Sequence, residues 1–443
     1  MQRLITWVLV VFAFCAPVAH ATANVEGFFD NTFASTGRKL IDVSASASDK
    51  GRILRIQPGG KLLMAGTCGS GALNYFCATR LSATGTIDLG FGPDGTGTIT
   101  FDRFFGQGFP TSDTLGDMLS LSDGRILFLG QTTLAMLTAD GTALDTGSGG
   151  GSGYIAVFGK YALAEQADHK ILVAGYALRN DPSNNYDMTV QRFLPDLSVD
   201  PNFGTNGSAS VIFNLGFSFS LANSIAVQTN GNIVLAGYVT FNGGPGKSVG
   251  IARLLPSGQL DPAFGGGAPI YQTPYGTENS ASSVRIDQRG RIVYGGYGAT
   301  DTNFSTRRCL INRLLANGNQ DFSFNANQPL TFTVPVGNTN VPCEIVDVAP
   351  QPDGTVLAVG SAADFYFAAV RLTPSGTFDP TFGTAGISYG GFDPSATSSI
   401  VRSGATAIGN GLMIAGSNYG SDIQFGIAQL TLTVRIFANG FEN

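Results

Sequence analysis

Two linked segments decide the fold: Gly231-Asn-Ile-Val-Leu-Ala-Gly237 and, further along, Arg253-Leu-Leu-Pro-Ser-Gly-Gln-Leu-Asp-Pro-Ala-Phe-Gly265. The first is a short apolar run between glycines, which is typical of a buried β-strand bounded by tight turns. The second contains the turn signal Pro-Ser-Gly and ends on Asp-Pro-Ala-Phe-Gly. Around them, four short strands are predicted at residues 209–213, 224–227, 233–238 and 250–255, so this unit can form a four-stranded meander.

The apolar segment recurs, which makes the chain a repeat protein. Its seven copies begin at Gly60, Gly124, His169, Gly231, Gly290, Gly354 and Gly411. Successive starts lie 64, 45, 62, 59, 64 and 57 residues apart, so the second unit is the short one. Helix-forming stretches are missing, while Gly (60 residues) and Phe (32 residues) are abundant, which favours strands and turns.

A second motif, Asp-x-x-Phe, lies between the apolar copies. It begins at Asp30, Asp88, Asp200, Asp261, Asp321 and Asp379. In the slot of Asp145 the aromatic residue is replaced by Ser148. An Arg stands eight residues before the Asp in five repeats, at Arg80, Arg192, Arg253, Arg313 and Arg371. We expect each Arg to meet its Asp across a turn as a structural ion pair, and not to belong to an anion-binding ring. The remaining repeats have Leu137 and Gln429 there.

This combination of motifs resembles the bacterial delta-60 repeat family over nearly the whole chain that follows its first residues. The segments 253–265 and 371–383, the latter reading Arg-Leu-Thr-Pro-Ser-Gly-Thr-Phe-Asp-Pro-Thr-Phe-Gly, carry the resemblance most clearly. It implies a repeat unit of exported proteins that has no assigned reaction.

The fold class expected is all-β: a seven-bladed β-propeller whose ring is closed by the N- and C-terminal segments. Radial packing of four-stranded units buries strand faces between blades and leaves only short edges. The motif at Asp30 has no apolar segment before it, and the segment at Gly411 has no Asp-x-x-Phe after it. This offset predicts that the two ends complete one unit. The alternative is a β-solenoid, whose coils are usually shorter and which needs no such match.

The first residues have the pattern of a secretory signal peptide: Arg3, an apolar run, then small residues ending at Ala21. Cleavage after Ala21 is preferred over cleavage after Ala23. The expected organisation is a signal peptide at residues 1–21, a seven-repeat propeller at 22–434 and a short tail at 435–443. The protein is therefore expected to be exported to the periplasm, the cell surface or the medium.

Four cysteines remain after such cleavage, and an even number in an oxidising compartment indicates two disulfides with three possible connectivities. Cys68 and Cys77 flank a segment where two strands would turn back on each other, which favours that pair. Cys309 with Cys343 then follows by elimination.

Residue counts exclude most catalytic constellations. His169 is the one histidine after the signal peptide and occupies a turn position that is Gly in other repeats, so neither a catalytic triad nor a histidine metal site is expected. The loops at 92–97, 180–187 and 242–248 favour turns over calcium or phosphate loops. We expect no catalytic residue, metal or cofactor, although paired carboxylates from different blades remain open as a glycosidase site.

Three tyrosines are the candidate ligand-binding residues. Tyr176, Tyr238 and Tyr297 each follow the glycine that ends an apolar segment. Because equivalent positions lie on one side of a ring, these residues should form an arc on which sugar rings stack. The alternative is that each tyrosine packs against its neighbouring blade.

The function predicted is that of a secreted, monomeric, non-catalytic binding or interaction propeller. Its partner is unknown, and a glycan or another extracellular protein are the candidates. With 13% charged residues and a net charge of −6, nucleic acid is excluded as a partner, and no later segment predicts membrane insertion. The alternatives are a carbohydrate-active enzyme with paired carboxylates at the propeller mouth and a purely structural surface protein.

Overall fold

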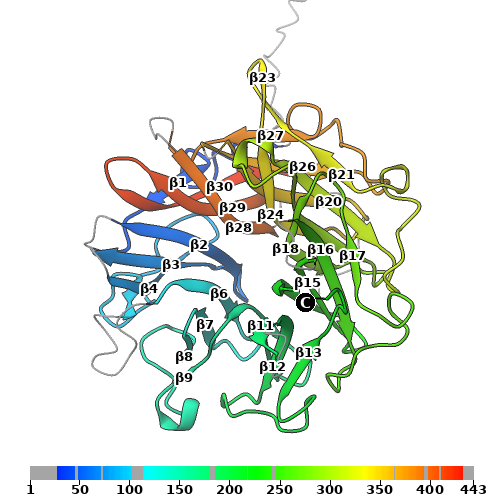
Figure 1. Cartoon of the computed structure of the whole chain (residues 1–443). Coiled ribbons are helices and arrows are strands. Elements are labelled where there is room, and N and C mark those ends of the chain that lie inside the picture. Colours follow the sequence, from blue (N-terminus) through cyan, green and yellow to red (C-terminus); the bar gives the residue numbers. More distant parts are fainter. Residues whose placement is uncertain are drawn as a thin grey trace, which may run out of the picture.

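The computed structural model describes residues 27–44, 48–70, 73–101, 113–179, 185–216, 218–241, 246–363, 365–393, 398–408 and 411–432. Regular structure in these ranges is almost entirely β-strand, with short 3-10 helices at η1 (Gly149–Gly151), η2 (Phe304–Thr306) and η3 (Asn325–Asn327). The sheets radiate from a common centre (Figure 1). The fold is an all-β propeller, as predicted. The predicted signal peptide and C-terminal tail lie outside the described residues.

Five of the sheets contain four strands each. One consists of β2 (Asp49–Ile56), β3 (Leu62–Ser70), β4 (Leu73–Leu81) and β5 (Thr98–Thr100). The next consists of β6 (Leu115–Ser120), β7 (Ile126–Gly130), β8 (Thr133–Leu137) and β9 (Tyr154–Ala156). A third consists of β10 (Lys160–Glu165), β11 (Ile171–Leu178), β12 (Tyr186–Phe193) and β13 (Ser208–Val211). A fourth consists of β24 (Cys343–Pro350), β25 (Val356–Ala362), β26 (Tyr366–Leu372) and β27 (Ile387–Gly390).

An eight-stranded sheet contains two consecutive meanders. The first is β14 (Ser220–Val227), β15 (Ile233–Thr240), β16 (Lys247–Leu254) and β17 (Ile270–Gln272). The second is β18 (Glu278–Ile286), β19 (Ile292–Ala299), β20 (Arg308–Leu314) and β21 (Leu330–Phe332). A parallel pair between Lys247 and Glu278 joins them. For this reason the described strands do not form seven separate sheets. A small ribbon is formed by β22 (Val334–Val336) and β23 (Thr339–Val341).

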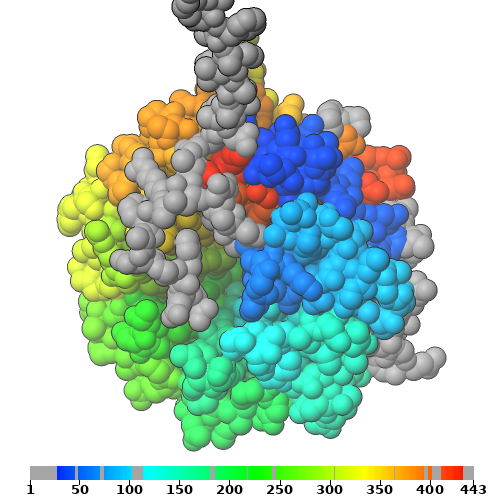
Figure 2. Space-filling view, turned by 180° about the vertical axis from the view of Figure 1, so that it is seen from behind, coloured from blue at the N-terminus to red at the C-terminus, as the bar shows by residue number. Residues whose placement is uncertain are grey.

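The fifth four-stranded sheet is built from both ends of the chain. Its order is β28 (Ser398–Ile408), β29 (Gly411–Tyr419), β30 (Ile423–Thr431) and β1 (Arg38–Ile41). Strands β1 and β30 are antiparallel, with Arg38 opposite Ala428 and Ile41 opposite Phe425. Figure 2 shows the blue N-terminal part lying against the red C-terminal part. This pairing agrees with the closure that the offset motifs predicted.

The apolar core lies between neighbouring sheets, and the Phe of the Asp-x-x-Phe motif is central to it. Phe264 is 1% exposed, and its ring lies against Gly318 of the next meander. Gly318 has a φ of +88°, and a Cβ added there would lie 2.7 Å from the Phe264 ring. Only glycine therefore allows the approach, and the same turn glycine recurs at Gly141 against Phe91. The Phe is thus a wedge between units.

The first strand of each meander is the innermost one. Each of these strands (β2, β6, β10, β14, β18, β24 and β28) contains a β-bulge at the same position relative to the second strand. The extra residues are Arg52, Gly116, Tyr161, Asn223, Ser282, Val346 and Arg402. A bulge bends the strand and redirects the side chains beside it. In this ring the bulges determine which side chains face the central channel and its mouth.

Candidate ligand-binding face

The three predicted tyrosines lie at one end of the sheets, on three successive units. Tyr176, Tyr238 and Tyr297 occupy the same register position in β11, β15 and β19, directly after the glycine that faces the innermost strand. All three are half-buried. They are therefore neither free surface residues nor fully enclosed packing residues.

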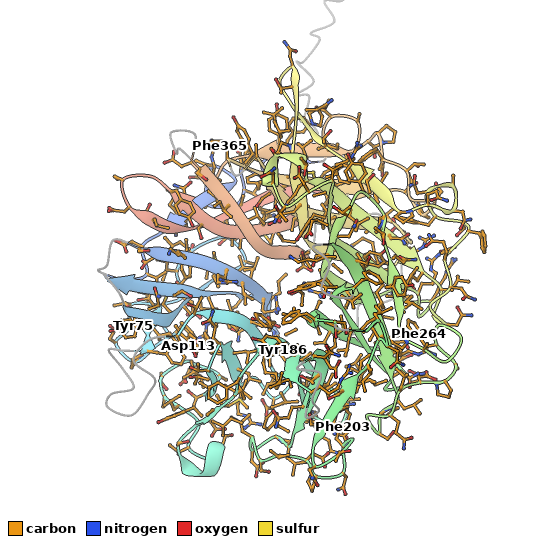
Figure 3. The ribbon with its side chains drawn as sticks, in the orientation of Figure 1. Tyr75, Asp113, Tyr186, Phe203, Phe264 and Phe365 are labelled. Atoms are coloured by element: carbon orange, nitrogen blue, oxygen red, sulfur yellow. A yellow bond between two sulfur atoms is a disulfide. The ribbon has the colours of Figure 1, made fainter. Side chains whose placement is uncertain are left out.

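Ring contacts connect Tyr176 and Tyr238 to aromatic residues of the neighbouring loops and strands. The ring centroid of Tyr176 is 6.0 Å from Tyr161, 5.5 Å from Tyr186 and 5.4 Å from Phe219. Phe219 in turn stacks on Tyr238 at 5.8 Å. We call the set Tyr161, Tyr176, Tyr186, Phe219, Tyr238 and Tyr297 the aromatic arc. Figure 3 labels Tyr186 towards the middle of the ring and Phe203 and Phe264 towards its rim.

The most exposed tyrosine of the arc is one that the sequence did not single out. Tyr161 is 37% exposed, and Phe158, three residues before it, is 70% exposed. Tyr161 is the bulge residue of β10, inserted between Lys160 and Ala162. The run Phe158-Gly-Lys-Tyr161 was visible in the sequence, but the bulge that turns Tyr161 towards Tyr176 depends on the strand register.

Charged side chains flank the far half of the arc. The Lys247 ammonium lies 5.0 Å from the centre of the Tyr238 ring and 3.5 Å from the Glu278 carboxylate. The Arg307 guanidinium lies 4.0 Å from the Tyr297 ring and forms an ion pair with Glu344. Aromatic faces, cations and carboxylates therefore share one surface, a combination that can stack on and hydrogen-bond a polar ligand.

The phenol groups of Tyr238 and Tyr297 stay protonated at neutral pH. Burial, together with the nearby Tyr161, Tyr297, Tyr176 and Glu278, raises the pKa of Tyr238 to about 12. Burial also raises the pKa of Tyr297, against the opposing field of Arg307. These hydroxyls are therefore neutral groups that can donate as well as accept hydrogen bonds.

Lys160 lies beside Tyr161 but is buried beneath the surface. It is 7% exposed, and its ammonium donates to the Thr189 hydroxyl at 2.8 Å. Burial lowers the pKa of Lys160 to about 8. Its side chain occupies the space between units where the equivalent residues Ala222 and Ala281 are small and apolar.

The central channel is a cavity of about 890 Å³ lined by the innermost strands. Asp117 pairs with Arg55 at 2.8 Å, and Asp347 pairs with Arg285 at 2.8 Å. Asp347 also accepts from the Ser283 hydroxyl at 2.7 Å. Burial raises the pKa of Asp117 against the opposing field of Arg55. Asp117 and Asp347 of the channel thus each have an arginine partner.

The five recurring Arg residues each contact the Asp of their own repeat. The Nε–Oδ2 distances lie between 2.7 and 2.9 Å for the pairs Arg80 with Asp88, Arg192 with Asp200, Arg253 with Asp261, Arg313 with Asp321 and Arg371 with Asp379. Each guanidinium carbon also lies 4.5 to 5.6 Å from the ring centre of the motif Phe. In the repeat that has Leu137 in place of this Arg, Arg125 pairs with Asp145 at 2.8 Å and donates to Ser148.

Both predicted disulfides are confirmed. Cys68 and Cys77 join the adjacent strands β3 and β4, with Cα atoms 5.8 Å apart. Cys309 and Cys343 join β20 to β24, and hence two neighbouring units, with Cα atoms 5.0 Å apart.

His169 occupies a turn with a φ of +64°, the conformation that glycine adopts at equivalent positions. Among the described residues, no group of three or more His, Cys, Asp or Glu side chains has an arrangement that could hold a metal ion. In the same part of the chain, no helix is long and apolar enough to cross a membrane.

Three segments match a protein family described as a domain of unknown function (DUF5122) β-propeller, at residues 166–203, 228–264 and 351–382. The matched segments are propeller repeats. Each begins at the turn before an apolar strand and ends near the motif Phe, so the family describes the same unit that the sequence shows. The narrower delta-60 name is not confirmed by this match. No curated protein matches the chain.

Several solved structures are similar to this chain at low sequence identity. A virginiamycin B lyase from Staphylococcus aureus is 12% identical, with 89% of this chain and 99% of that chain covered and a TM-score of 0.47. An ulvan lyase is 11% identical, with 89% and 96% covered and a TM-score of 0.49. PorZ, a surface component of the type IX secretion system of Porphyromonas gingivalis, is 11% identical, with 86% and 46% covered and a TM-score of 0.44. At these scores the likeness supports no inference about function.

Proposed function

We propose that the protein is an exported, monomeric, non-catalytic propeller that binds a glycan on the aromatic arc. The observation that carries the proposal is the exposure of Tyr161 at the start of a continuous row of rings that reaches Tyr238. Phe158, three residues before Tyr161, adds a second exposed ring. The aromatic rings supply stacking faces for a sugar, and Lys247 and Glu278 beside the half-buried Tyr238 supply directional polar groups. Another extracellular protein that contributes polar loops is the alternative partner.

The ring we propose has seven blades, with the eight-stranded sheet counted as two. The pair that joins its halves, Lys247 with Glu278, links the first residue of a third strand to the start of the next innermost strand. Tyr186 with Phe219, and Ser48 with Ile423, are parallel bridges at the equivalent point between separate sheets. The joining pair is therefore an ordinary contact between blades, which supports counting the two meanders separately.

Export is part of the same proposal. Two disulfides, one of them between units, are the usual products of an oxidising compartment. Separating the periplasm, the cell surface and the medium requires fractionation of cells that express the full chain, followed by detection of the protein in each fraction.

A glycan array probed with the full-length exported protein tests the binding proposal. Phe158→Ala combined with Tyr161→Ala should remove most of the signal on any glycan that the unmodified protein retains, because both exposed stacking faces are lost. Phe322→Ala is the matched control, since Phe322 is 74% exposed but belongs to the Asp-x-x-Phe turn at the opposite end of the sheets. Retention that is unchanged in the double variant would overturn the placement of the site.

A second candidate function is carbohydrate cleavage in the central channel. The position of Asp117 in the channel favours it, because burial raises the pKa of this carboxyl, which is the direction that a general acid requires. Release of reducing ends or unsaturated products from polysaccharides by the protein, abolished in Asp117→Asn, would support this function over simple binding.

A further inference from the structure

One recurring arginine differs from three of its counterparts in its third hydrogen bond. In three repeats, Nη1 of the arginine donates to a backbone carbonyl of the next unit. The pairs are Arg80 with Ala139, Arg192 with Pro256 and Arg253 with Ala316. These bonds satisfy the buried guanidinium and attach each unit to its neighbour.

Arg313 lacks this bond. It is 1% exposed, its Nε donates to Asp321 at 2.7 Å and its Nη2 donates to Ser323 at 3.2 Å. Among the described residues, its Nη1 is buried and has no hydrogen-bond partner. The equivalent acceptor would be the carbonyl of Pro374, in the turn of the next unit. A buried donor of a charged group that has no hydrogen-bond partner costs folding free energy. An acceptor bound at this position would remove that cost.

The repeat of Arg313 also lacks a second acceptor, which other repeats have in the turn before the apolar strand. Gln166 and Gln228 accept from Nη1 of Arg192 and Arg253, each at 3.4 Å. The residue at this turn position in the repeat of Arg313 is Asp287. Its carboxylate accepts instead from Arg291, at 2.6 Å from Nε, and from two backbone amides of the same turn. Asp287 is therefore occupied elsewhere.

A cavity of about 280 Å³ lies beside this guanidinium. Arg289, Arg291 and Arg313 line it together with Ser323, Ser375 and one carboxylate, Asp353. Arg289 is exposed, and within the described ranges its guanidinium makes no side-chain contact. Asp321 and Asp287 neutralise part of the charge of Arg313 and Arg291, and all three arginines line the same small space.

We propose that this pocket binds a small oxyanion, with the guanidinium groups of Arg313, Arg291 and Arg289 as its donors. A sulfate, phosphate or carboxylate group supplies the acceptor that Nη1 of Arg313 lacks, and planar guanidinium groups match the geometry of such anions. The cavity has room for one ion or one acidic sugar residue. The pocket lies at the end of the sheets opposite to the aromatic arc, so the proposal does not depend on glycan binding there.

Equilibrium dialysis of the full chain against labelled inorganic sulfate, at constant ionic strength in sodium chloride, tests the proposal. Direct binding is measured because sulfate stabilises many proteins without a specific site. Arg289→Ala removes an exposed donor without disturbing the core and should weaken binding about tenfold, the usual effect of losing one charge-assisted hydrogen bond. Arg313→Lys keeps a cation opposite Asp321 but lacks Nη1, and should abolish binding.

Arg253→Lys is the matched control, because it makes the same change where Nη1 already has a carbonyl partner. Its sulfate binding should equal that of the unmodified protein. No saturable binding, or equal binding in Arg289→Ala and the unmodified protein, would overturn the proposal. Competition by glucuronate and by inorganic phosphate separates the sources: stronger competition by glucuronate assigns the site to an acidic sugar, and stronger competition by phosphate assigns it to a free ion.

Discussion

The side-chain amide of Gln429 donates a hydrogen bond to the Asp30 carboxylate at 3.0 Å and so links the last described strand to the beginning of the described chain. Gln429 stands where five repeats have Arg, and Asp30 is the Asp of the first motif. The backbone repeats this link, since the Asp30 amide donates to the Gln429 carbonyl at 2.9 Å. The closing unit therefore also has a side-chain hydrogen bond to its motif Asp, with a neutral amide as the donor in place of the guanidinium.

Asp30→Ala should weaken this closure. The variant loses the bond from Gln429 and the two bonds from Thr32 to the Asp30 carboxylate, so we expect a loss of about 2 kcal/mol in the free energy of unfolding. Denaturant unfolding followed by fluorescence measures the change. Asp422→Ala, at an exposed position, is the control, and an equal effect of both substitutions would contradict the role given to Asp30.

The two disulfides should differ in their contribution to stability. On the loop-entropy account, closing the 34-residue separation of Cys309 and Cys343 should stabilise the fold by about 1 kcal/mol more than closing the nine-residue separation of Cys68 and Cys77. Denaturant unfolding of the two double-serine variants tests this order. Because Cys309 and Cys343 join neighbouring units, their loss should also make chymotrypsin cleavage between β20 and β24 faster, at residues such as Phe322. The reverse order of stabilities would contradict the argument.

Acid should destabilise the fold through Asp321. Burial opposes ionisation of this group, but its hydrogen bonds with Ser323 and Arg313 outweigh burial and lower its pKa to about 2. The folded pKa lies below the unfolded value of about 4, so this stabilisation is complete above pH 4 and is lost as the pH falls towards 2.

Asp321→Asn should therefore cost about 2 kcal/mol at pH 7 and much less near pH 2, as measured by urea unfolding across this range. Asp168→Asn, whose side chain is 55% exposed, is the control and should show no comparable change. A cost for Asp321→Asn that is the same at both pH values would refute the linkage.

Lys160 should destabilise the fold at neutral pH. Burial lowers its folded pKa to about 8, below the unfolded value of about 10.4, so the cost of burying its charge is complete below pH 8 and disappears as the pH rises past 10. Lys160→Met should stabilise the protein by about 1–2 kcal/mol at pH 7, after subtraction of the lost bond to Thr189. The gain should shrink at pH 10. Lys170→Met, at a partly exposed surface position, is the comparison, and a gain at Lys160 that does not depend on pH would disprove the explanation.

Much of the fold could be predicted from the sequence, because the residues that form the blade contacts recur at fixed spacing. The Phe wedge, the turn glycine opposite it and the Arg–Asp pair are local in each repeat, so their periodicity indicates a ring. The pair between Lys247 and Glu278 could not be predicted. It depends on how closely the third strand of one meander approaches the innermost strand of the next, which is a matter of packing and not of residue type.

The candidate site was only partly predictable. The common position of Tyr176, Tyr238 and Tyr297 followed from the repeat, but Phe158 and Tyr161 lie outside the repeated motifs. The side chain of Tyr161 reaches Tyr176 because of a one-residue bulge, and a bulge leaves no reliable trace in composition or periodicity. The unsatisfied Nη1 of Arg313 is likewise visible only when the carbonyls of the next unit are placed in space.

The shared closing sheet also bears on circular permutation. The amide of Gly27 donates to the carbonyl of Thr431 at 2.8 Å, so the two limits of the described chain lie side by side. A short linker between them, with new ends cut into the turn at residues 157–159, would keep every strand pair and would place the new ends between two sheets. The contacts between blades thus do not depend on the position in the ring at which the chain begins and ends.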